Sequence, residues 1–351
     1  MGQNVQRRLR RQRPMPKRAL RYTILDSAAS GCKQAARNSP MLIRQATLDD
    51  TRQIVALFSG RVPVWQRLNE QGQVEDLPYD ALSIYERWLH GGAWMSLETG
   101  SIWLSHVLSG NGLAFVMVDD GRVLAYAEAF LNRELTPMGS HLHLAELLVD
   151  ERCSDDDHHN LADTILSNAR APGRLSVAHP DYDNDLATYF RRYFGASEAF
   201  RLTRYSINAQ IGQSFYKSQE YTKTEASQID DWALAVGRWT SPRALWESEW
   251  IEHWRGIPQI IARSKHRHYI NASGHEALVC FHQQLYNERS ADVYCWSPRH
   301  LSTQLLVAIR DMGHRLGFRS LTLALPEAAA ELLPPENTAD PNQQVIATVS
   351  V

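Results

Sequence analysis

The same succession of apolar patterns occurs twice in this chain, about 145 residues apart. Ser154 and Ser297 each precede an amphipathic stretch, and the apolar runs RLSVA (from 174) and SLTLAL (from 320) follow. Solenoid repeats are only about 20–50 residues long, so this distance predicts a duplicated domain. A chain of 351 residues also exceeds one typical core. We expect a first domain over 41–211, a linker over 212–225 and a second, more degenerate domain over 226–351.

Hydrophobic periodicity predicts the elements of the first half. A strand at 42–46 precedes helical stretches, which break at Gly91-Gly92. Asp120-Gly121 lies between two apolar runs and predicts a hairpin. The remaining predicted elements are a strand at 141–149, a helix at 155–170, a strand at 174–178, a helix at 183–194 and a strand at 200–208.

The second half repeats this outline weakly. We expect a helical stretch at 227–237, a segment rich in tryptophan, a hairpin at Ser273-Gly274, a strand at 292–296, a helix at 299–316 and a strand at 320–325. Both halves therefore predict an α/β (α+β) fold, with a mixed central sheet flanked by helices in each of two tandem domains.

The stretch LLVDERCSDDDHHNLADTIL (147–166) changes from a strand pattern to a helix pattern at a cluster of acids and histidines. Ser154 and Asp157 have the spacing of a capping box, and Asp155 lies near the positive end of the helix dipole. His158 and His159 are adjacent, so on a helix they point about 100° apart and do not converge easily on one ion. We therefore expect a helix cap and no metal site.

This order of elements, opened by LIRQAT and containing that strand–loop–helix, resembles the GNAT superfamily of acyl-CoA-dependent N-acyltransferases. The resemblance covers most of 41–210 and, more faintly, 220–351. Tandem pairs of such domains occur in mycothiol synthase-like proteins, where one half is often inactive. The resemblance implies transfer of an acyl group, with acetyl-CoA or another acyl-CoA as co-substrate, to a small-molecule or peptide amine.

The family's cofactor loop is altered here. Its pattern, roughly Arg/Gln-x-x-Gly-x-Gly/Ala, holds the pyrophosphate on backbone N–H groups. Three carboxylates and no glycine occupy that place in the first half, and their charge opposes phosphate. By position, the resemblance nominates Leu148, Val149, Ser154 and Asp155 as cofactor-binding residues. In the second half, WSPRHL suggests Ser297 as the N-cap of the next helix, with Arg299 and His300 facing phosphate.

The resemblance also implies a carboxylate base on a central strand and a tyrosine acid on the following helix. Glu146 is the first candidate base and Glu128 the second, because a carboxylate in an apolar strand must be paired or face a cleft. The family's tyrosine would fall at Arg191, four residues before Gly195, so Tyr189 or Tyr193 must replace it. Both tyrosines also fit a core stripe.

Tryptophans gather in two helical segments, where the resemblance places the acceptor groove. Such aromatic side chains suit an amine or an acyl chain, and core packing between the domains is an equal alternative. The segments hold Trp88, Trp94, Trp103, Trp246, Trp250 and Trp254. A catalytically inactive GNAT-fold protein that binds a ligand or a partner is the alternative to the N-acyltransferase.

Charge divides the chain at residue 40. Ten Lys or Arg and one acid give 1–40 a charge of +9, so the net −2 of the whole chain leaves −11 for 41–351. We expect 1–40 to be a disordered arm, or to be untranslated with Met41 as the start. Nucleic acid is a partner only if this arm exists. The four cysteines lack pairing motifs and no apolar run is long enough for a membrane helix, which favours a cytoplasmic protein.

Overall fold

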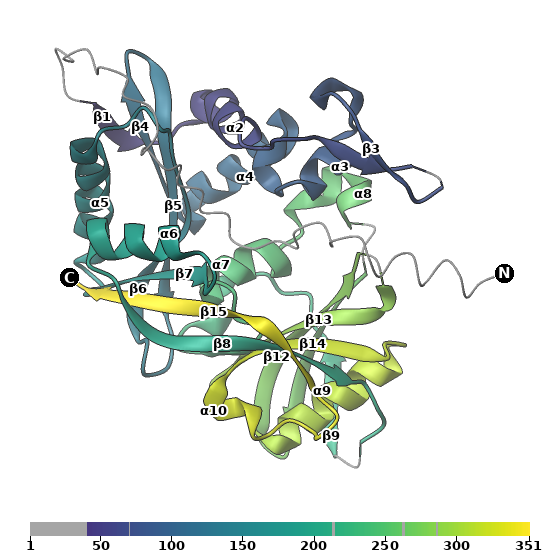
Figure 1. Cartoon of the computed structure of the whole chain (residues 1–351). Coiled ribbons are helices and arrows are strands. Elements are labelled where there is room, and N and C mark those ends of the chain that lie inside the picture. The colour runs from purple at the N-terminus through teal and green to yellow at the C-terminus, as the bar shows by residue number, and fades with distance from the viewer. Residues whose placement is uncertain (1–40, 70, 213–214, 262–263, 286) are drawn as a thin grey trace.

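One large mixed sheet runs through the protein (Figure 1). The computed structural model describes residues 41–351 except 70, 213–214, 262–263 and 286, so the basic segment 1–40 lies outside the described residues. Thirteen strands form this sheet in the order β1-β4-β5-β6-β7-β15-β8-β14-β13-β12-β11-β9, with β10 pairing with β13.

The first half follows the predicted order of elements, apart from the hairpin of β2 and β3, which was not predicted. It comprises β1 (Leu42–Gln45), α2 (Thr51–Ser59), the small hairpin β2 (Gln66–Leu68) and β3 (Val74–Asp76), α3 (Ile84–Leu89), α4 (Leu97–His106), β4 (Leu113–Asp119), β5 (Arg122–Arg133), β6 (Ser140–Val149), α5 (Asp155–Ala169), β7 (Arg174–Pro180), α6 (Asn184–Tyr189) and β8 (Ser197–Asn208). The predicted hairpin is confirmed, because Asp119 pairs with Arg122 and both turn residues have positive φ.

The second half repeats the outline with one important difference. It comprises β9 (Tyr216–Glu220), β10 (Ala233–Val236), α7 (Pro242–Leu245), α8 (Pro258–Ile261), β11 (Lys265–Ala272), β12 (His275–Gln284), β13 (Asn287–Ser297), α9 (Thr303–Arg315), β14 (Ser320–Pro326), α10 (Glu327–Ala330) and β15 (Thr338–Ser350). The helix predicted at 227–237 is wrong. Only a short turn of 3-10 helix, Ala226–Ile229, precedes β10, because Leu234 and Val236 pair with β13.

The segment 212–225, which the sequence suggested as a linker, contains β9. This strand pairs with β11 at the edge of the sheet, as β1 pairs with β4 at the opposite edge. The halves also exchange their last strands. β15 pairs with β7 of the first half, β8 pairs with β14 of the second, and the two strands pair with each other (Figure 1). The two half-sheets are thereby joined into one.

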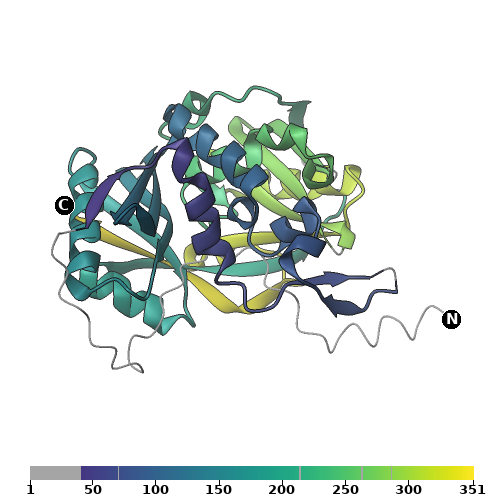
Figure 2. The same ribbon diagram turned by 90° about the horizontal axis from the view of Figure 1, so that it is seen from above.

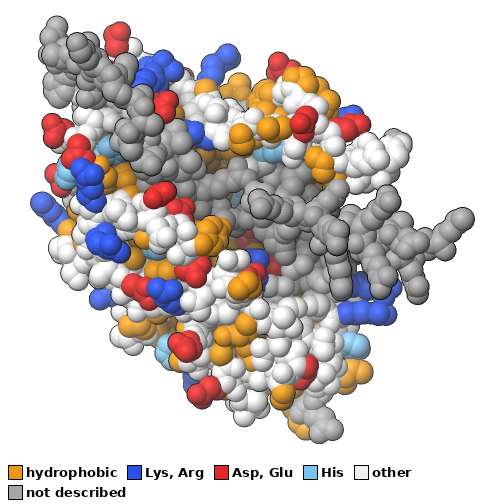
Figure 3. All heavy atoms as spheres, in the orientation of Figure 1, with side chains coloured by type: hydrophobic (Ala, Val, Ile, Leu, Met, Phe, Trp, Pro, Cys, Tyr) orange, Lys and Arg blue, Asp and Glu red, His pale blue; other side chains and the backbone are white. Residues whose placement is uncertain are grey.

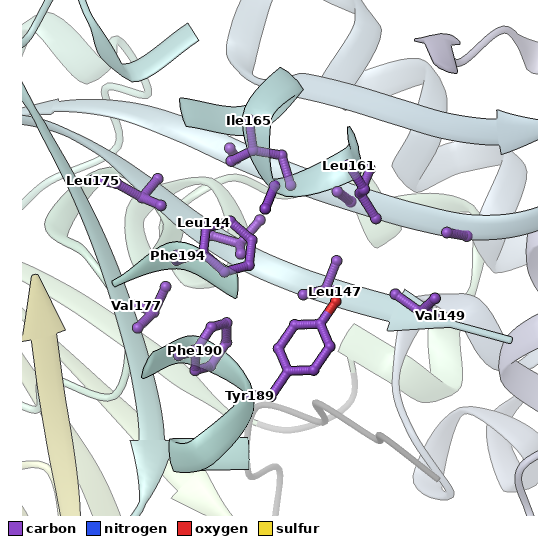
Figure 4. Packing of buried hydrophobic residues seen from close by; sticks show 14 of the residues in the cluster. Leu144, Leu147, Val149, Leu161, Ile165, Leu175, Val177, Tyr189, Phe190 and Phe194 are labelled. Atoms are coloured by element: carbon purple, nitrogen blue, oxygen red, sulfur yellow. The ribbon is translucent and has the colours of Figure 1, made fainter. Parts of the chain in front are cut away.

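Helices cover both faces of the first half-sheet (Figure 2). On one face, α5 buries Leu161 and Ile165 against β6 and β7, and the helical segment that follows α6 buries Phe190 there (Figure 4). Gly195, with φ 70°, ends the helical segment that follows α6, as its position predicted. On the other face, α2 and α4 pack with Trp254 and other apolar residues of the second half. Segments of the second half therefore complete this core.

Two of the six tryptophans belong to the core of the second half. Trp246 and Trp250 stack with ring centroids 4.4 Å apart, and Trp296 meets both rings edge-on. All three side chains are fully buried. Trp246 and Trp250 therefore pack inside the second half, and the expected packing between the domains is not found for these two residues.

Polar contacts also join the halves. Arg238 forms a buried ion pair with Glu134, and Thr240 contacts Nε2 of His143 through its hydroxyl, at 2.8 Å. The backbone N–H of Arg243 donates to Asn132 Oδ1 at 2.9 Å. Because a buried charge without its partner is costly, such contacts hold the halves in one arrangement.

The surface and the cysteines show nothing unusual. Acidic and basic side chains are mixed on the face shown in Figure 3. Cys153, Cys280 and Cys295 are buried free thiols. None of the helices in the described part of the chain is long and apolar enough to cross a membrane.

Candidate active site

A cavity of about 170 Å³ lies between the two halves. The first half contributes residues of α2, β5, β6 and the segment around α4, and the second half contributes residues of 239–254 and β13. Its lining includes both candidate bases and three of the predicted tryptophans. These residues are Glu128, Glu146, Trp94, Trp103 and Trp254. These tryptophans pack in a core cluster that includes residues of both halves, and they also line the cavity.

Glu128 is a buried carboxyl on β5, with 1% of its surface exposed. Trp103 Nε1 donates a hydrogen bond to its Oε2 at 2.8 Å, and the Tyr126 hydroxyl donates to the same oxygen at 2.9 Å. Burial raises the pKa of Glu128 from 4.5 to about 7, although both hydrogen bonds and the charge of His106 act in the opposite direction. A carboxyl with a pKa near neutrality can both take up and release a proton at physiological pH.

Glu146 lies directly opposite Glu128 on the neighbouring strand β6. The register shifts at this point, so that Ala145 becomes an extra residue, and Ala145 and Glu146 both line the cavity. Such bulges commonly re-aim a side chain beside a functional site. Tyr126, next to both carboxylates, has a strongly raised pKa, first because of burial and then because of the charge of Glu128.

Two histidines that sequence reasoning did not nominate belong to the same region. His106 Nε2 lies 2.8 Å from Glu247 Oε2, and its ring stacks on that of His253 at 4.8 Å. His253 lines the cavity and contacts the Trp103 ring at 5.2 Å. His106 belongs to the first half and His253 to the second. They come together only when the halves pack, so no local sequence motif contains them both. Tyr126 was not nominated either, although its position two residues before Glu128, on the same strand face, is a signal that could have found it.

The N-terminus of α5 is a helix cap, as predicted. Ser154 is the N-cap, and Asp157 accepts from its backbone N–H at 2.7 Å in a capping box. Asp155 is held by Arg192 at 2.7 Å and by the hydroxyl of Tyr193. Asp156 is exposed. This turn therefore carries three carboxylates, one of them offset by Arg192.

The two candidate acids lie beside this cap, on the α5 face of the sheet. Burial and the hydrogen bond to Asp155 raise the pKa of Tyr193 to about 12. The Tyr189 hydroxyl lies 3.0 Å from Nδ1 of His158. The Tyr189 side chain lies among buried apolar residues (Figure 4), and burial raises the pKa of its hydroxyl strongly. His158 and His159 thus contact Tyr189 and the backbone of Asp155, respectively. Among the described residues, no group of three His, Cys, Asp or Glu is arranged to hold a metal ion.

The strands β6 and β7 separate next to the cavity. Only Leu142 and His143 of β6 pair with β7 in the described chain, although β6 continues to Val149. Past this point Leu148 packs toward α2 and α4, and Val149 packs toward α5. The cavity that contains Glu128 lies on one face of the sheet at the point where these strands separate. Tyr189 and Tyr193 lie on the opposite face.

In the second half, the prediction that Ser297 is an N-cap is wrong. The helix α9 begins after Ser302, whose hydroxyl accepts from the N–H of Leu305. Ser297 is instead the buried last residue of β13, and its hydroxyl lies 2.9 Å from His275 Nε2. Arg299 and His300 are exposed in the intervening loop. These two residues therefore precede the first turn of the helix and do not lie in it.

The strand β10 lies where β13 and β14 separate. Among the described residues, β13 pairs with β14 at Ser290–Asp292 only, and beyond that point β10 pairs with β13. The next residue, Gly237, donates its N–H to Ala324 of β14 at 2.9 Å. In the first half, β6 and β7 separate and leave a gap. In the second half, β10 and Gly237 fill the corresponding gap between β13 and β14.

No family model and no curated protein matches the sequence. The structure is similar to a GCN5-related N-acetyltransferase from Anabaena variabilis, with a TM-score of 0.57 and 10% identity over 89% of this chain and 73% of that one. It is also similar to a conserved protein of unknown function from Enterococcus faecalis, named as a probable N-acyltransferase, with a TM-score of 0.52 and 9% identity over the same shares.

A tandem GNAT protein from the clavulanic acid biosynthesis pathway gives a TM-score of 0.45 at 11% identity, covering 88% of this chain and 98% of that one. At such identities the likenesses concern the fold. The expected GNAT fold, with a mixed sheet flanked by helices, is confirmed by the first two structures.

Proposed function

We propose that this protein is an N-acyltransferase that moves an acyl group from acyl-CoA to an amine, and that the first half carries the reaction. One observation carries the proposal: a buried carboxyl, Glu128, with a pKa of about 7, lies in a cavity next to the parting of two central strands. The fold is that of acetyltransferases, and the activity is inferred from this site.

Glu128 is the preferred base over Glu146, which the sequence ranked first. An amine is protonated at neutral pH and must lose a proton before it attacks a thioester carbonyl. Glu128 is fully buried, is fixed by Trp103 and Tyr126, and titrates in the range where proton uptake is efficient. Glu146, on the same strand face and only partly buried, is placed to attract the ammonium form of the amine.

The second half is assigned a supporting role. In the described part of this half, β10 and Gly237 fill the gap between β13 and β14, so the gap found between β6 and β7 has no equivalent there. We therefore assign the acyl-CoA to the first half, and Arg299 and His300 carry no role in this proposal.

The weak point of the first half is the N-terminus of α5. Asp155, Asp156 and Asp157 oppose a pyrophosphate there, by ~1 kcal/mol per close pair of charges even in water. Support for transferase activity therefore comes from the cavity side of the sheet. The same observation favours a second candidate function, a GNAT-fold protein that binds an amine or a partner without catalysis.

Calorimetric titration with acetyl-CoA separates the two functions. For the transferase we expect weak binding by the wild-type protein, and acyl transfer to a panel of amines that Glu128→Gln abolishes. A matched control is Glu98→Gln, which changes an exposed carboxylate on the same helix as Trp103. Absence of acetyl-CoA binding by both the wild type and the Asp155→Gly, Asp156→Gly variant would reject the transferase and leave the binding protein.

A further inference from the structure

The second half places a buried carboxylate, Glu247, against the end of α4. Glu247 lies in the helical turn Trp246–Trp250, and its side chain has no exposed surface. His106 is the last residue of α4 and is 13% exposed, and its Nε2 lies 2.8 Å from Glu247 Oε2. Salt screens a buried pair much less than a pair at the surface. A histidine of one half and a carboxylate of the other therefore act on each other at close to full strength.

Arg243 holds Glu247 in place from the opposite side. Its guanidinium Nε donates to Glu247 Oε1 from the preceding turn, and its backbone N–H donates to Asn132 Oδ1 on β5. The ionised carboxylate accepts hydrogen bonds at both oxygens, so it can meet Arg243 and His106 together. A carboxylate at this distance favours the positively charged form of an imidazole ring.

His106 lies next to the residue that fixes the candidate base. His106 and Trp103 are three residues apart on α4, which makes them neighbours on the helix surface, and their ring centroids are 5.6 Å apart. Trp103 Nε1 in turn donates to Glu128 Oε2 at 2.8 Å. The charge of His106 favours the ionised form of Glu128, whereas burial raises the pKa of Glu128 to about 7.

Other titratable groups surround the base on several elements. They are Tyr126 of β5, Glu146 of β6, Glu249 and His253 of the segment 239–254, and Tyr294 of β13. The ring of His253 also stacks on that of His106, with centroids 4.8 Å apart. His106 differs from these groups because its charge is known to lower the pKa of Glu128 and because it is paired with the second half.

We propose that His106 and Glu247 form a positioning pair through which the second half keeps Glu128 ready to accept a proton. Both are positioning residues, because they act through the base and need not touch the acyl group or the amine. The inference rests on the proposed function, since it names residues that control the base of the same site. It gives the second half a part in the reaction although no acyl-CoA is assigned to that half.

The ionisation of Glu128 can be followed at Trp103 by NMR, without any substrate. The indole N–H of Trp103 binds the titrating carboxyl, and a hydrogen bond to an ionised acceptor is shorter and stronger, so the indole proton signal should move as Glu128 ionises. Trp103→Phe identifies this signal among those of the ten tryptophans. In the whole chain we expect a transition with its midpoint near pH 7, and Glu128→Gln should abolish it.

Two variants remove one charge each from the pair. His106→Gln deletes the charge of the imidazole, and Glu247→Gln deletes the carboxylate that favours this charge. Each should move the midpoint at Trp103 upward by about one pH unit, the low end of the shifts that a neighbouring charge causes. Glu247→Asp keeps the charge and should leave the midpoint closer to that of the wild type than Glu247→Gln does. The matched control is Glu98→Gln, an exposed position on the same helix, which should leave the midpoint unchanged.

A purely structural role would lower the melting temperature of the variants without moving this midpoint. Circular dichroism melting shows which variants are folded, and if one of the two Gln variants does not fold, the other decides. An unchanged or lowered midpoint in a folded variant would overturn the inference. A transition that persists in Glu128→Gln would also overturn it, because the signal would then report a histidine.

Failure of this inference is distinguishable from failure of the transferase. If both hold, the midpoint of the acyl-transfer rate against pH should move upward together with the NMR midpoint in both Gln variants. Shifted NMR midpoints in a protein without acyl transfer reject catalysis and retain the control of Glu128 by the second half. Acyl transfer with the same pH profile in the wild type and in both folded variants rejects the positioning pair alone.

Discussion

Replacing Glu128 with Gln should change both the pH dependence of stability and the activity. Gln has nearly the same shape and retains an oxygen that can accept hydrogen bonds from Trp103 and Tyr126. It cannot take up a proton. The variant therefore removes the titration of the residue 128 side chain and keeps most of its packing contacts.

The magnitude follows from the shift in pKa. The folded protein raises the pKa of Glu128 from 4.5 to about 7, so between these values the folded state holds a proton that the unfolded chain has lost. Stability therefore falls as the pH rises through this window. A shift of this size corresponds to ~3 kcal/mol, at 1.36 kcal/mol per pKa unit. This stabilisation is fully present below pH 4.5 and is lost above pH 7.

The assay is urea unfolding of wild type and Glu128→Gln from pH 4 to pH 8. The free energy of unfolding of the wild type minus that of the variant should fall by ~3 kcal/mol across this range. Acyl transfer by the wild type should rise about tenfold from pH 6 to pH 8, because the ionised fraction of a group with a pKa of 7 rises from about a tenth to about nine-tenths. Parallel stability curves for the two proteins would refute the buried titration.

The remaining predictions concern the helix cap, the closed strand gap and the exchanged strand. The double variant Asp155→Gly, Asp156→Gly should bind acetyl-CoA more tightly than the wild type in calorimetry. The weak binding by the wild type should strengthen with salt, because salt screens charges over ~8–10 Å. Tight wild-type binding at low salt that the double variant loses would contradict this prediction. Gly237→Ala should lower the free energy of unfolding, measured in urea, by more than ~2 kcal/mol, because φ at this position is 87° and a Cβ would lie 2.4 Å from the backbone oxygen of Val293. The control is Gly256→Ala, where an added Cβ would meet no atom within 4 Å. Ile346→Ala, in β15, should cost ~2–5 kcal/mol in one cooperative transition, and two separate transitions would show that the halves unfold independently.

Local signals explain why much of the fold is predictable from the sequence. The hairpin at Asp120-Gly121 and the capping box of Ser154 and Asp157 depend on neighbouring residues only. The second hairpin, at Ser273-Gly274, also forms as predicted, with positive φ at both residues. Where a turn or a cap decides the structure, the sequence pattern is sufficient.

Tertiary pairing explains the misses. The run WALAV contains good helix formers, yet β10 forms there because β13 offers an edge to pair with. Ser297 and Ser302 are equally suitable N-caps by type, and His275, from a distant strand, binds the hydroxyls of both. Neither outcome can be read from a local window.

The candidate site was only partly predictable for the same reason. Glu128 and Glu146 could be nominated because each interrupts an apolar strand. Their ranking depended on Trp103, which lies 25 residues before Glu128 and donates a hydrogen bond to it. The second half supplies part of the cavity lining, including His253 and Trp254. This contribution depends on how the two halves pack together, which the hydrophobic periodicity of a single segment does not predict.

The position of β15 has a consequence for how this chain is made. Val345 pairs with His179, a separation of 166 positions (345 − 179), so β7 has no neighbour on that side until residues near 350 leave the ribosome. Synthesis at about 5–20 residues per second leaves that edge exposed for roughly ten to thirty seconds. Unpaired strand edges readily join other chains. Pairings this distant in sequence are also slow to form. The first half, which carries the candidate base, is therefore completed last.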